Sequence, residues 1–189
     1  EKKINFKKDV CGLMLETFQG WGALFYPKDF VQYLSIFCKK NNIILAFDEM
    51  QSGFSRTGKN FGFMHYNVQP DLICCGKGMG GGLPISGVLG KKELLDLPEI
   101  GSMSSTHSAN PLVCEAGNAV IDEIEKKNLN NETLRKGKIV LKILNRIKKA
   151  NKKIIKHISS KGLIPGIIFD EKNKKINKCN SSVVFSCMQ

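Results

Sequence analysis

Residues 43–90, IILAFDEMQSGFSRTGKNFGFMHYNVQPDLICCGKGMGGGLPISGVLG, decide the fold class of this chain. They contain two apolar runs, Ile43 to Phe47 and Leu72 to Cys75, which are too short for typical helices and lead directly into polar or glycine-rich sequence. This pattern predicts two buried strands. Ligands of open α/β sheets bind just outside the carboxyl ends of the strands, so we expect Asp48 and Lys77 to converge on one ligand.

The sequence before this stretch predicts a strand, a loop and a helix. Val10 to Leu15 is an apolar strand candidate, and Glu16 to Gly22 is a loop by its glycines. Pro27 opens a helix that Asn41 and Asn42 end. Its expected buried face consists of Phe30, Val31, Leu34, Phe37 and Cys38. The order strand, loop, helix, strand is typical of a crossover between parallel strands.

The sequence after Lys77 predicts further elements of both kinds. Five glycines lie between Gly76 and Gly82, and Asn110 and Pro111 are a good N-cap and first residue of a helix. The expected elements are a strand over Pro84 to Leu89, helices over 111–126 and 132–149, a strand over Gly162 to Phe169 and an apolar run at Val183 to Phe185.

The composition is that of a soluble globular protein, with 42% hydrophobic and 24% charged residues in 189. No apolar run approaches the roughly 18 to 20 residues that span a bilayer, and the charged start EKKINFKKDV is unlike a signal peptide. We therefore expect a cytoplasmic protein without a membrane partner. The chain starts at Glu1 without an initiator Met, which suggests a fragment of a longer protein.

The net charge of +12 raises the question of a nucleic-acid surface. Residues 136–178 contain 13 Lys and one Arg against Asp170 and Glu171, so the remainder of the chain sums to zero. The basic residues alternate with Ile and Leu, as on the solvated face of an amphipathic helix. Because aromatic interleaving and a recognisable RNA or DNA module are missing, we expect no nucleic-acid partner.

The seven cysteines and three histidines show no ligand spacing. The cysteines fall mostly inside apolar runs and form no C-x-x-C pair, so we interpret them as reduced core residues. His65, His107 and His157 are widely spaced singletons. We expect them to be structural and expect no metal site.

Two phosphate-binding motifs fail at the glycine-rich centre. Gly76 to Gly81 satisfies G-x-G-x-x-G after a strand, but it leads into Pro84 and a new strand, where a dinucleotide site requires a helix. A P-loop requires Ser or Thr after the lysine and a glycine at position 71, but Gly78 and Asp71 stand there.

What remains is a lysine cleared of neighbouring side chains and an acid at the end of a neighbouring strand. Glycines on both sides let a flat ligand approach the amine of Lys77. A desolvated lysine can form a Schiff base with a carbonyl, and pyridoxal phosphate combines such a lysine with an acid on its pyridine nitrogen. The alternative is that Asp48 is a helix cap and Lys77 an unrelated surface lysine.

Three motifs resolve this choice by resemblance. FDEMQSGFSRTG, PDLICCGKGMGGGLPISGVLG and STHSANP resemble, in order and spacing, the class III or omega-amino-acid type aminotransferases, the family of 4-aminobutyrate and ornithine aminotransferases. The resemblance extends from about Val10 to the end of the chain. It implies an α/β protein of fold type I, with a large domain around a mostly parallel seven-stranded sheet, a smaller α+β C-terminal domain, and a homodimer with active sites at the subunit interface.

The resemblance also implies roles for individual residues. Lys77 matches the lysine that binds pyridoxal phosphate as a Schiff base and shuttles the proton, and Asp48 matches the acid on the pyridine nitrogen. Gln51 matches the residue near the phenolic oxygen of the cofactor. Thr106 matches a threonine that reaches the phosphate of the neighbouring subunit's cofactor. The substrate pocket would include Glu16, Gln19 and Trp21, while Ser52, Arg56 and Thr57 are expected to hold their loop.

Trp21 departs from the family pattern. In 4-aminobutyrate and ornithine aminotransferases an acid follows the Gln-Gly pair and neutralises a substrate-binding arginine. A tryptophan there predicts a different switch between substrates, with a less charged or larger amine or an aromatic wall over the cofactor.

The resemblance predicts a transaminase that moves an amino group from an amine or amino-acid donor to a 2-oxo acid by a ping-pong mechanism. The alternatives are an aminomutase, racemase or decarboxylase of the same fold, or an inactive truncated homologue that serves as an interaction module. We expect residues 1–135 to be the C-terminal half of the cofactor-binding large domain and residues 136–189 a linker helix and an incomplete small domain. The N-terminal half, with its phosphate cradle and ring-stacking residue, and the C-terminal arginine are missing, so the chain alone should be inactive.

Overall fold

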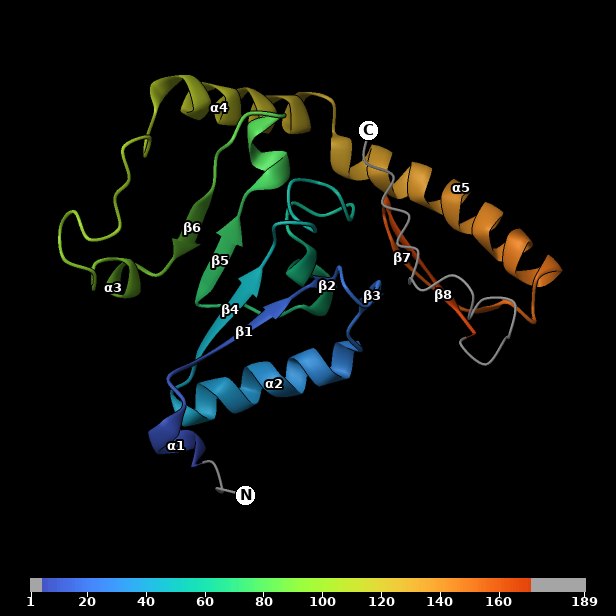
Figure 1. Cartoon of the computed structure of the whole chain (residues 1–189), viewed down its shortest axis with the longest axis horizontal. Coiled ribbons are helices and arrows are strands. Elements are labelled where there is room, and N and C mark those ends of the chain that lie inside the picture. Colours follow the sequence, from blue (N-terminus) through green and yellow to red (C-terminus); the bar gives the residue numbers. More distant parts are fainter. Residues whose placement is uncertain (1–4, 171–189) are drawn as a thin grey trace.

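A computed structural model describes residues 5–170 of the chain. Helices and strands alternate through the first half, and two helices and a hairpin form the second (Figure 1). The elements are α1 (Phe6–Asp9), β1 (Gly12–Glu16), β2 (Phe18–Gln19), β3 (Leu24–Phe25), α2 (Lys28–Asn41), β4 (Ile44–Asp48), the 3-10 helix η1 (Gly62–Tyr66), β5 (Leu72–Cys75), the 3-10 helix η2 (Lys77–Gly80), β6 (Gly87–Gly90), α3 (Lys92–Leu95), α4 (Pro111–Lys126), α5 (Leu129–Ala150), β7 (Ile155–Lys161) and β8 (Ile164–Phe169). The predicted run Val183 to Phe185 lies outside the described residues.

A four-stranded sheet with the order β1-β4-β5-β6 forms the centre of the molecule. β1 pairs with β4 and β4 with β5 in parallel, whereas β6 runs antiparallel to β5. The predicted strands at Ile43 to Phe47 and Leu72 to Cys75 are confirmed as β4 and β5, and Val10 to Leu15 corresponds to β1. The mostly parallel α/β fold is therefore confirmed.

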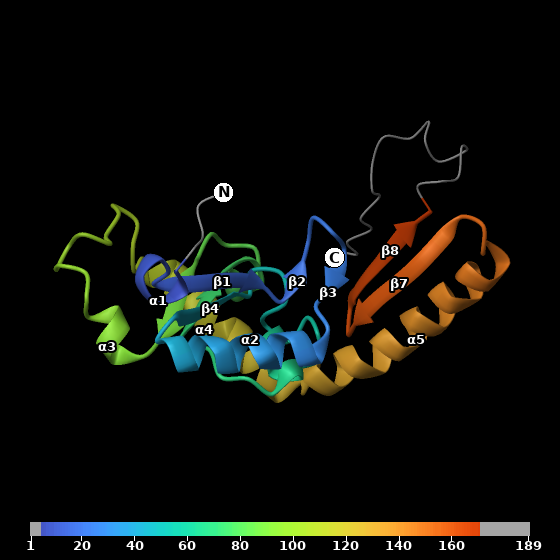
Figure 2. The same ribbon diagram turned by 90° about the horizontal axis from the view of Figure 1, so that it is seen from below.

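The main core lies between the sheet and α2, which crosses one face of it (Figure 2). Val31 and Cys38 of α2 pack with Leu45 and Phe47 of β4 and with aromatic side chains of η1. The helix begins after Pro27 and ends at Asn42, whose left-handed conformation (φ 53°) terminates it, as predicted. The prediction is wrong for one residue of the expected buried face. Phe30 is 45% exposed because it lies at the margin of the buried face, where its ring contacts Tyr26.

The segment Glu16 to Gly22 is more ordered than the predicted loop. It contains β2, which pairs antiparallel with β3 through Phe18↔Phe25 and Gln19↔Leu24. Two-residue strands have no period that a sequence pattern could reveal. The pairing is stabilised by burial of Phe18 against Ile164 of β8, which joins this ribbon to the C-terminal hairpin.

The second half follows the predicted helices but contains an unpredicted strand. α4 occupies residues 111–126 as expected, and the Asn110 side chain caps it by accepting the N–H of Leu112 at 3.0 Å. α5 begins at Leu129, three residues before the predicted start, and packs against β7. β7 and β8 form an antiparallel hairpin. Only β8 was predicted, because the sequence of β7, IKHISSK, has too many polar residues to show a strand pattern.

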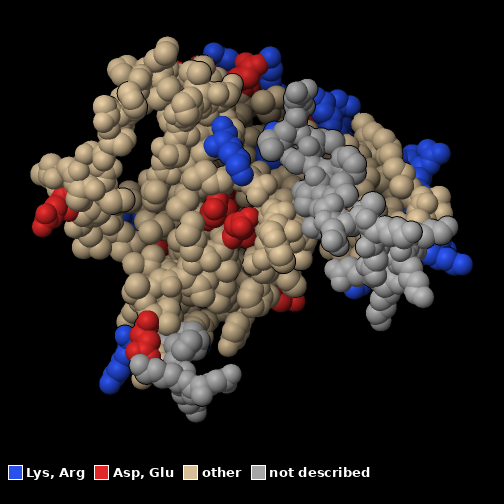
Figure 3. Space-filling view, in the orientation of Figure 1, with Lys and Arg blue, Asp and Glu red and all other residues tan. Residues whose placement is uncertain are grey.

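The surface agrees with the charge distribution in the sequence. The lysines of α5 are mostly exposed, and Figure 3 shows basic side chains along this helix. Five described cysteines are free thiols, but Cys11 and Cys114 are exposed, so the expectation of core positions is wrong for these two. Both lie on an outward face of their segment, where an apolar neighbour in sequence does not imply burial. None of the helices within residues 5–170 has the length and apolarity needed to cross a membrane.

Candidate active site

The carboxyl ends of the parallel strands bring three polar side chains into one row. Glu16, Asp48 and Cys74 are register partners on β1, β4 and β5, so their side chains leave the same face of the sheet. The charge of Asp48 adds to burial in raising the pKa of the Cys74 thiol, as expected of close neighbours. The Asp48 carboxylate is oriented by the N–H of Met50, which donates to Oδ1 at 2.9 Å. The acid predicted at the end of β4 is therefore held in a fixed orientation at the carboxyl edge of the sheet.

Lys77 lies two residues beyond β5 and begins η2. Its backbone has φ +44°, in the left-handed region that glycine adopts readily and other residues adopt rarely. Such a conformation costs roughly 1–3 kcal/mol and is typical of functional sites. The side chain is exposed, whereas the sequence predicted a desolvated lysine, because the cavity that it lines is open to solvent. The chain holds a strained, accessible amine at the same edge of the sheet as Asp48.

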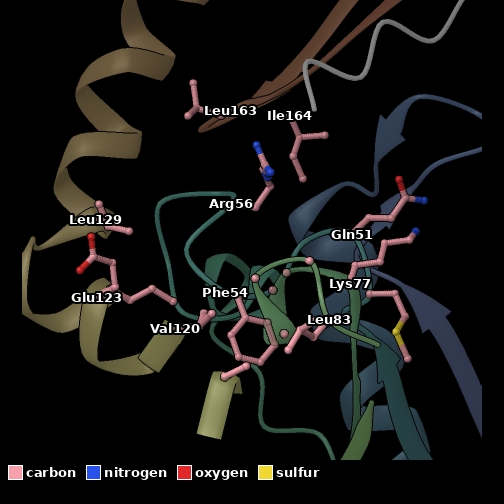
Figure 4. Close-up of a pocket in the computed structure, with 18 of the residues that line it drawn as sticks. Gln51, Phe54, Arg56, Lys77, Leu83, Val120, Glu123, Leu129, Leu163 and Ile164 are labelled. Carbon is pink, nitrogen blue, oxygen red and sulfur yellow. The ribbon is translucent and has the colours of Figure 1, made fainter. Parts of the chain in front are cut away.

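Lys77 and Gln51 contribute to the wall of an open cavity of about 1200 Å³ (Figure 4). Figure 4 shows these two side chains on one side and Glu123 and Leu129 on the other, with Arg56 between them and the hairpin. Most other lining residues are apolar or glycine; they are Phe18, Met50, Gly53, Phe54, Gly78, Gly80, Gly81, Gly82, Leu83, Ala116, Ala119, Val120, Ile124, Leu163, Ile164 and Pro165. A largely apolar cavity with a few convergent polar groups is typical of a small-molecule site.

Two glycines let the loops at this edge approach one another closely. A side chain at Gly20 would overlap the amide of Gln51, so the turn between β2 and β3 lies directly against Gln51. A side chain at Gly76 would overlap the sulfur of Met50, so the loops after β4 and β5 are in contact as well. The loop that carries Met50 and Gln51 is thus packed against the segments on both sides of it.

The predicted pocket residues on the first loop lie outside this cavity. Glu16 folds its own loop back by accepting the N–H of Gly20 at 3.0 Å, and Gln19 is part of β2. Trp21 is 88% exposed. None of these three side chains lines the 1200 Å³ cavity among the described residues.

Thr106 is not among the residues that line the cavity with Lys77. It lies exposed in the segment between α3 and α4, which Figure 1 shows extending outward beyond β6. The structure brings Lys77 and Gln51 together and aligns Asp48 with Glu16, but it does not bring Thr106 to them.

Sequence reasoning missed Glu49. Its side chain is completely buried one residue beyond β4, in alternation with the buried side chains of Leu45 and Phe47. Burial raises the pKa of Glu49, while hydrogen bonds from Thr17, Gly62, Ser52 and Phe63 oppose this shift. The period of two along residues 45, 47 and 49 was the signal that could have identified it, because it places Glu49 inside and Asp48 on the other face.

The residues predicted to hold the loop divide into two groups. Ser52 and Thr57 are fully buried, and Ser52 donates to Glu49 at 2.8 Å. Arg56 instead borders the cavity, and its carbonyl accepts the N–H of Leu163 at 3.0 Å, which attaches the hairpin to the loop.

Among residues 5–170, His, Cys, Asp and Glu side chains form no group of three that could hold a metal ion.

Comparison with known proteins agrees with this geometry. The probable 4-aminobutyrate aminotransferase of Bacillus subtilis is 42% identical over 132 residues, which are 69% of this chain and 30% of the relative. The ornithine aminotransferase of Oceanobacillus iheyensis is 35% identical over 178 residues, 93% of this chain and 44% of the relative. The chain thus spans between about a third and under a half of the length of these relatives.

Solved structures give the same relationship. The ornithine aminotransferase of Plasmodium yoelii superposes with a TM-score of 0.80 at 33% identity, covering 86% of this chain and 44% of that one. The acetylornithine aminotransferase of Elizabethkingia anophelis gives a TM-score of 0.82 at 28% identity, covering 90% and 43%. The sequence profile of the family described as Aminotransferase class-III matches residues 2–185. The chain belongs to the class-III aminotransferase family.

Proposed function

We propose that this chain carries the lysine side of the active site of a pyridoxal phosphate-dependent transaminase. The observation that supports this most directly is the position of Lys77, a strained and accessible amine at the carboxyl edge of a parallel sheet, inside the region that matches the family. The relatives are named as aminotransferases that act on 4-aminobutyrate, ornithine and acetylornithine.

The residues present fit this cofactor. Lys77 provides an amine at an open cavity, Gln51 provides an amide on the same wall, and Asp48 provides a carboxylate at the end of the adjacent strand. A carbonyl compound with a basic ring nitrogen and a phenolic oxygen needs these three groups. The glycines from 78 to 82 leave room beside the lysine for a flat ring.

Each of these side chains has a separate task in the proposed reaction. Pyridoxal phosphate supplies, when bound, the carbonyl carbon that receives the amino group and a ring that accepts electrons. Lys77 would hold the cofactor through Nζ and, as a free amine, move a proton to and from the substrate carbon. Asp48 would keep a proton on the ring nitrogen, and Gln51 would donate an N–H to the phenolic oxygen.

The substrates would be an amine or amino-acid donor and a 2-oxo acid acceptor. Glu16, Gln19 and Trp21 lie on the loop that Gly20 brings against Gln51, so this loop would border the substrate. Trp21 would offer the donor an exposed aromatic surface where an acid stands in 4-aminobutyrate and ornithine aminotransferases.

The active site would be completed in a homodimer. Thr106 is exposed, as a residue that contacts a neighbouring subunit's cofactor must be in one isolated chain. Leu97, Ile100 and Met103 nearby are 73%, 107% and 80% exposed. Large apolar side chains that are exposed so close together in sequence favour a contact with another protein surface.

The proposed domain division lies at residues 135 and 136. α5, which runs from 129 to 150 across this point, would connect the large domain to the small one, and β7 and β8 would begin the small domain. The cytoplasmic location also remains a proposal.

Transfer of an amino group tests the function. The full-length protein is supplied with pyridoxal phosphate, a panel of 15N-labelled amines and 2-oxoglutarate or pyruvate, and label in glutamate or alanine is measured. Labelled product that disappears in Lys77→Ala supports a transaminase. Turnover of the donor by loss of carbon dioxide, racemisation or movement of its own amino group would assign another reaction of the same fold, and no turnover would favour an interaction module.

A further inference from the structure

Glu49 is a buried carboxylate at the centre of a hydrogen-bond network. One oxygen accepts the hydroxyl of Thr17 and the N–H of Phe63, the latter at 2.9 Å. The other accepts the hydroxyl of Ser52 at 2.8 Å and the N–H of Gly62 at 2.7 Å. Each oxygen therefore contacts one hydroxyl and one backbone N–H, so this carboxyl group is the common partner of four polar groups.

These four donors come from three separate segments. Thr17 follows β1, Ser52 lies in the loop after β4, and Gly62 and Phe63 begin η1. A buried carboxylate seldom stabilises a fold more than an apolar side chain of equal volume would. Its specific contribution is directional, because it fixes where each donor must lie.

The network lies one residue away from the predicted site groups. Thr17 follows Glu16, Glu49 follows Asp48, and Ser52 follows Gln51. At the ends of β1 and β4 neighbouring side chains face opposite sides, so holding Thr17 and Glu49 inside orients the residue before each toward the outer face. Gln51 and Ser52 lie in a turn, where holding Ser52 fixes the backbone that also carries Gln51. The ends of β1 and β4 and the start of the Gln51 loop are therefore all attached to one side chain.

We propose that Glu49 is the positioning residue of this active site: through Thr17, Ser52, Gly62 and Phe63 it holds the backbone that orients Asp48 and Gln51 toward the cofactor. This inference rests on the proposed function, because Asp48 and Gln51 have a cofactor to meet only in a pyridoxal phosphate enzyme. Glu49 itself contacts neither substrate nor cofactor and acts through its neighbours.

Glu49→Gln in the full-length protein isolates this role. The amide group keeps the volume, but its NH₂ must face either Gly62 or Phe63, whose N–H groups cannot reverse as a hydroxyl can. We expect kcat to fall on the order of 10-fold to 100-fold, as for small misplacements of catalytic groups, with a smaller change in KM for the amine donor. The absorption of the bound cofactor should shift, and amide exchange at Gly62 or Phe63 should accelerate.

Matched variants make the outcome decisive. Glu125→Gln, on the exposed side of α4, should behave as the parent. Glu49→Asp keeps the charge and should recover part of the lost kcat. If Glu49→Gln folds and retains the parental kcat and cofactor spectrum, the proposal is wrong.

If Glu49→Gln does not fold, a second variant tests the same proposal. Thr17→Val with Ser52→Ala removes both hydroxyl donors and leaves the carboxylate with its backbone donors. A folded double variant must show lower kcat and an altered cofactor spectrum, and parental values would overturn the proposal. Absence of cofactor at Lys77 in the parent would refute the proposed function instead, and amide exchange at Gly62 and Phe63 would still report on the network.

Discussion

Asp48 and Glu49 are consecutive residues whose carboxylates face opposite sides of the sheet. Asp48 lies in the row with Glu16 and Cys74, where burial and the charge of Asp48 raise the pKa of the Cys74 thiol. Glu49 is fully buried and receives four hydrogen bonds. Asp48 thus stays partly exposed at the edge of the sheet, while Glu49 holds together the segments behind that edge.

Asp48→Asn tests the assignment of the outer carboxylate. A neutral amide cannot stabilise a proton on the ring nitrogen, so we expect kcat/KM to fall on the order of 10²- to 10³-fold, as when one preorganised electrostatic group is removed. The measurement is steady-state transamination in the full-length protein, together with the absorption spectrum of the cofactor.

Asp71→Asn is the matched control. Asp71 accepts the N–H of Leu45 at 2.9 Å and the amine of Lys91 at 2.6 Å, so its role is structural. This variant should lose stability and keep the cofactor spectrum. Equal losses of activity in both variants at full folding would contradict the role of Asp48.

Phe47→Ala tests the core beneath the site. Phe47 is completely buried, and its ring lies 5.8 Å from that of Phe63. We expect the free energy of unfolding to decrease by about 3–5 kcal/mol, from lost transfer energy and the cavity left behind. Phe30 is 45% exposed, so Phe30→Ala should lower the free energy of unfolding by less than about 2 kcal/mol. Urea denaturation measures both, and equal costs would contradict the described core.

His65 predicts a pH dependence of stability. Burial lowers its pKa below the ordinary 6.5, with Lys161 and Lys59 adding to the effect and the bond to the Thr57 carbonyl opposing it. In the window below 6.5 the unfolded chain binds more protons at this site than the folded one, so the folded state loses stability as the pH falls through it.

The measurement for His65 is the free energy of unfolding as a function of pH. In His65→Gln the part of the slope that this histidine causes should vanish. His107→Gln, at an exposed position, should keep the parental slope. An unchanged slope in His65→Gln would show that the folded chain does not disfavour the charged imidazole.

Trp21→Glu tests the origin of donor specificity. Introducing an acid at this exposed position should move the preferred donors toward charged amines such as ornithine and 4-aminobutyrate. The comparison is the ratio of kcat/KM between charged and aromatic amines in parent and variant. Identical donor profiles would remove Trp21 from the specificity argument.

Residue pattern alone predicted most of the central sheet. The apolar runs before Asp48 and Gly76 are bounded by polar or glycine residues, and such short buried strands are visible without tertiary information. The N-cap at Asn110 was equally readable, because Asn followed by Pro has a local physical cause.

The missed elements depend on contacts that are distant in sequence. β7 is polar along much of its length and forms because β8 and α5 are adjacent to it. β2 exists through pairing with β3 and burial against Ile164. Glu49 was overlooked because its donors lie up to 32 residues away, and no local pattern shows that they converge.

The candidate site residues differ in how far their positions could be predicted, for the same reason. Asp48, Gln51 and Lys77 follow strand ends, so topology places them at one edge of the sheet. Thr106 and Trp21 are exposed and lie outside the cavity, so the roles proposed for them rest on the family resemblance alone.

Borohydride trapping of the full-length protein with pyridoxal phosphate tests Lys77 most directly. The reduced protein is digested and the modified lysine identified by mass spectrometry, with Lys77→Ala as the test variant and Lys91→Ala as the control. A pyridoxyl group on Lys77, lost in Lys77→Ala and retained in Lys91→Ala, is the expected result. Label spread over the exposed lysines of α5 without preference for Lys77 would contradict the proposed active site.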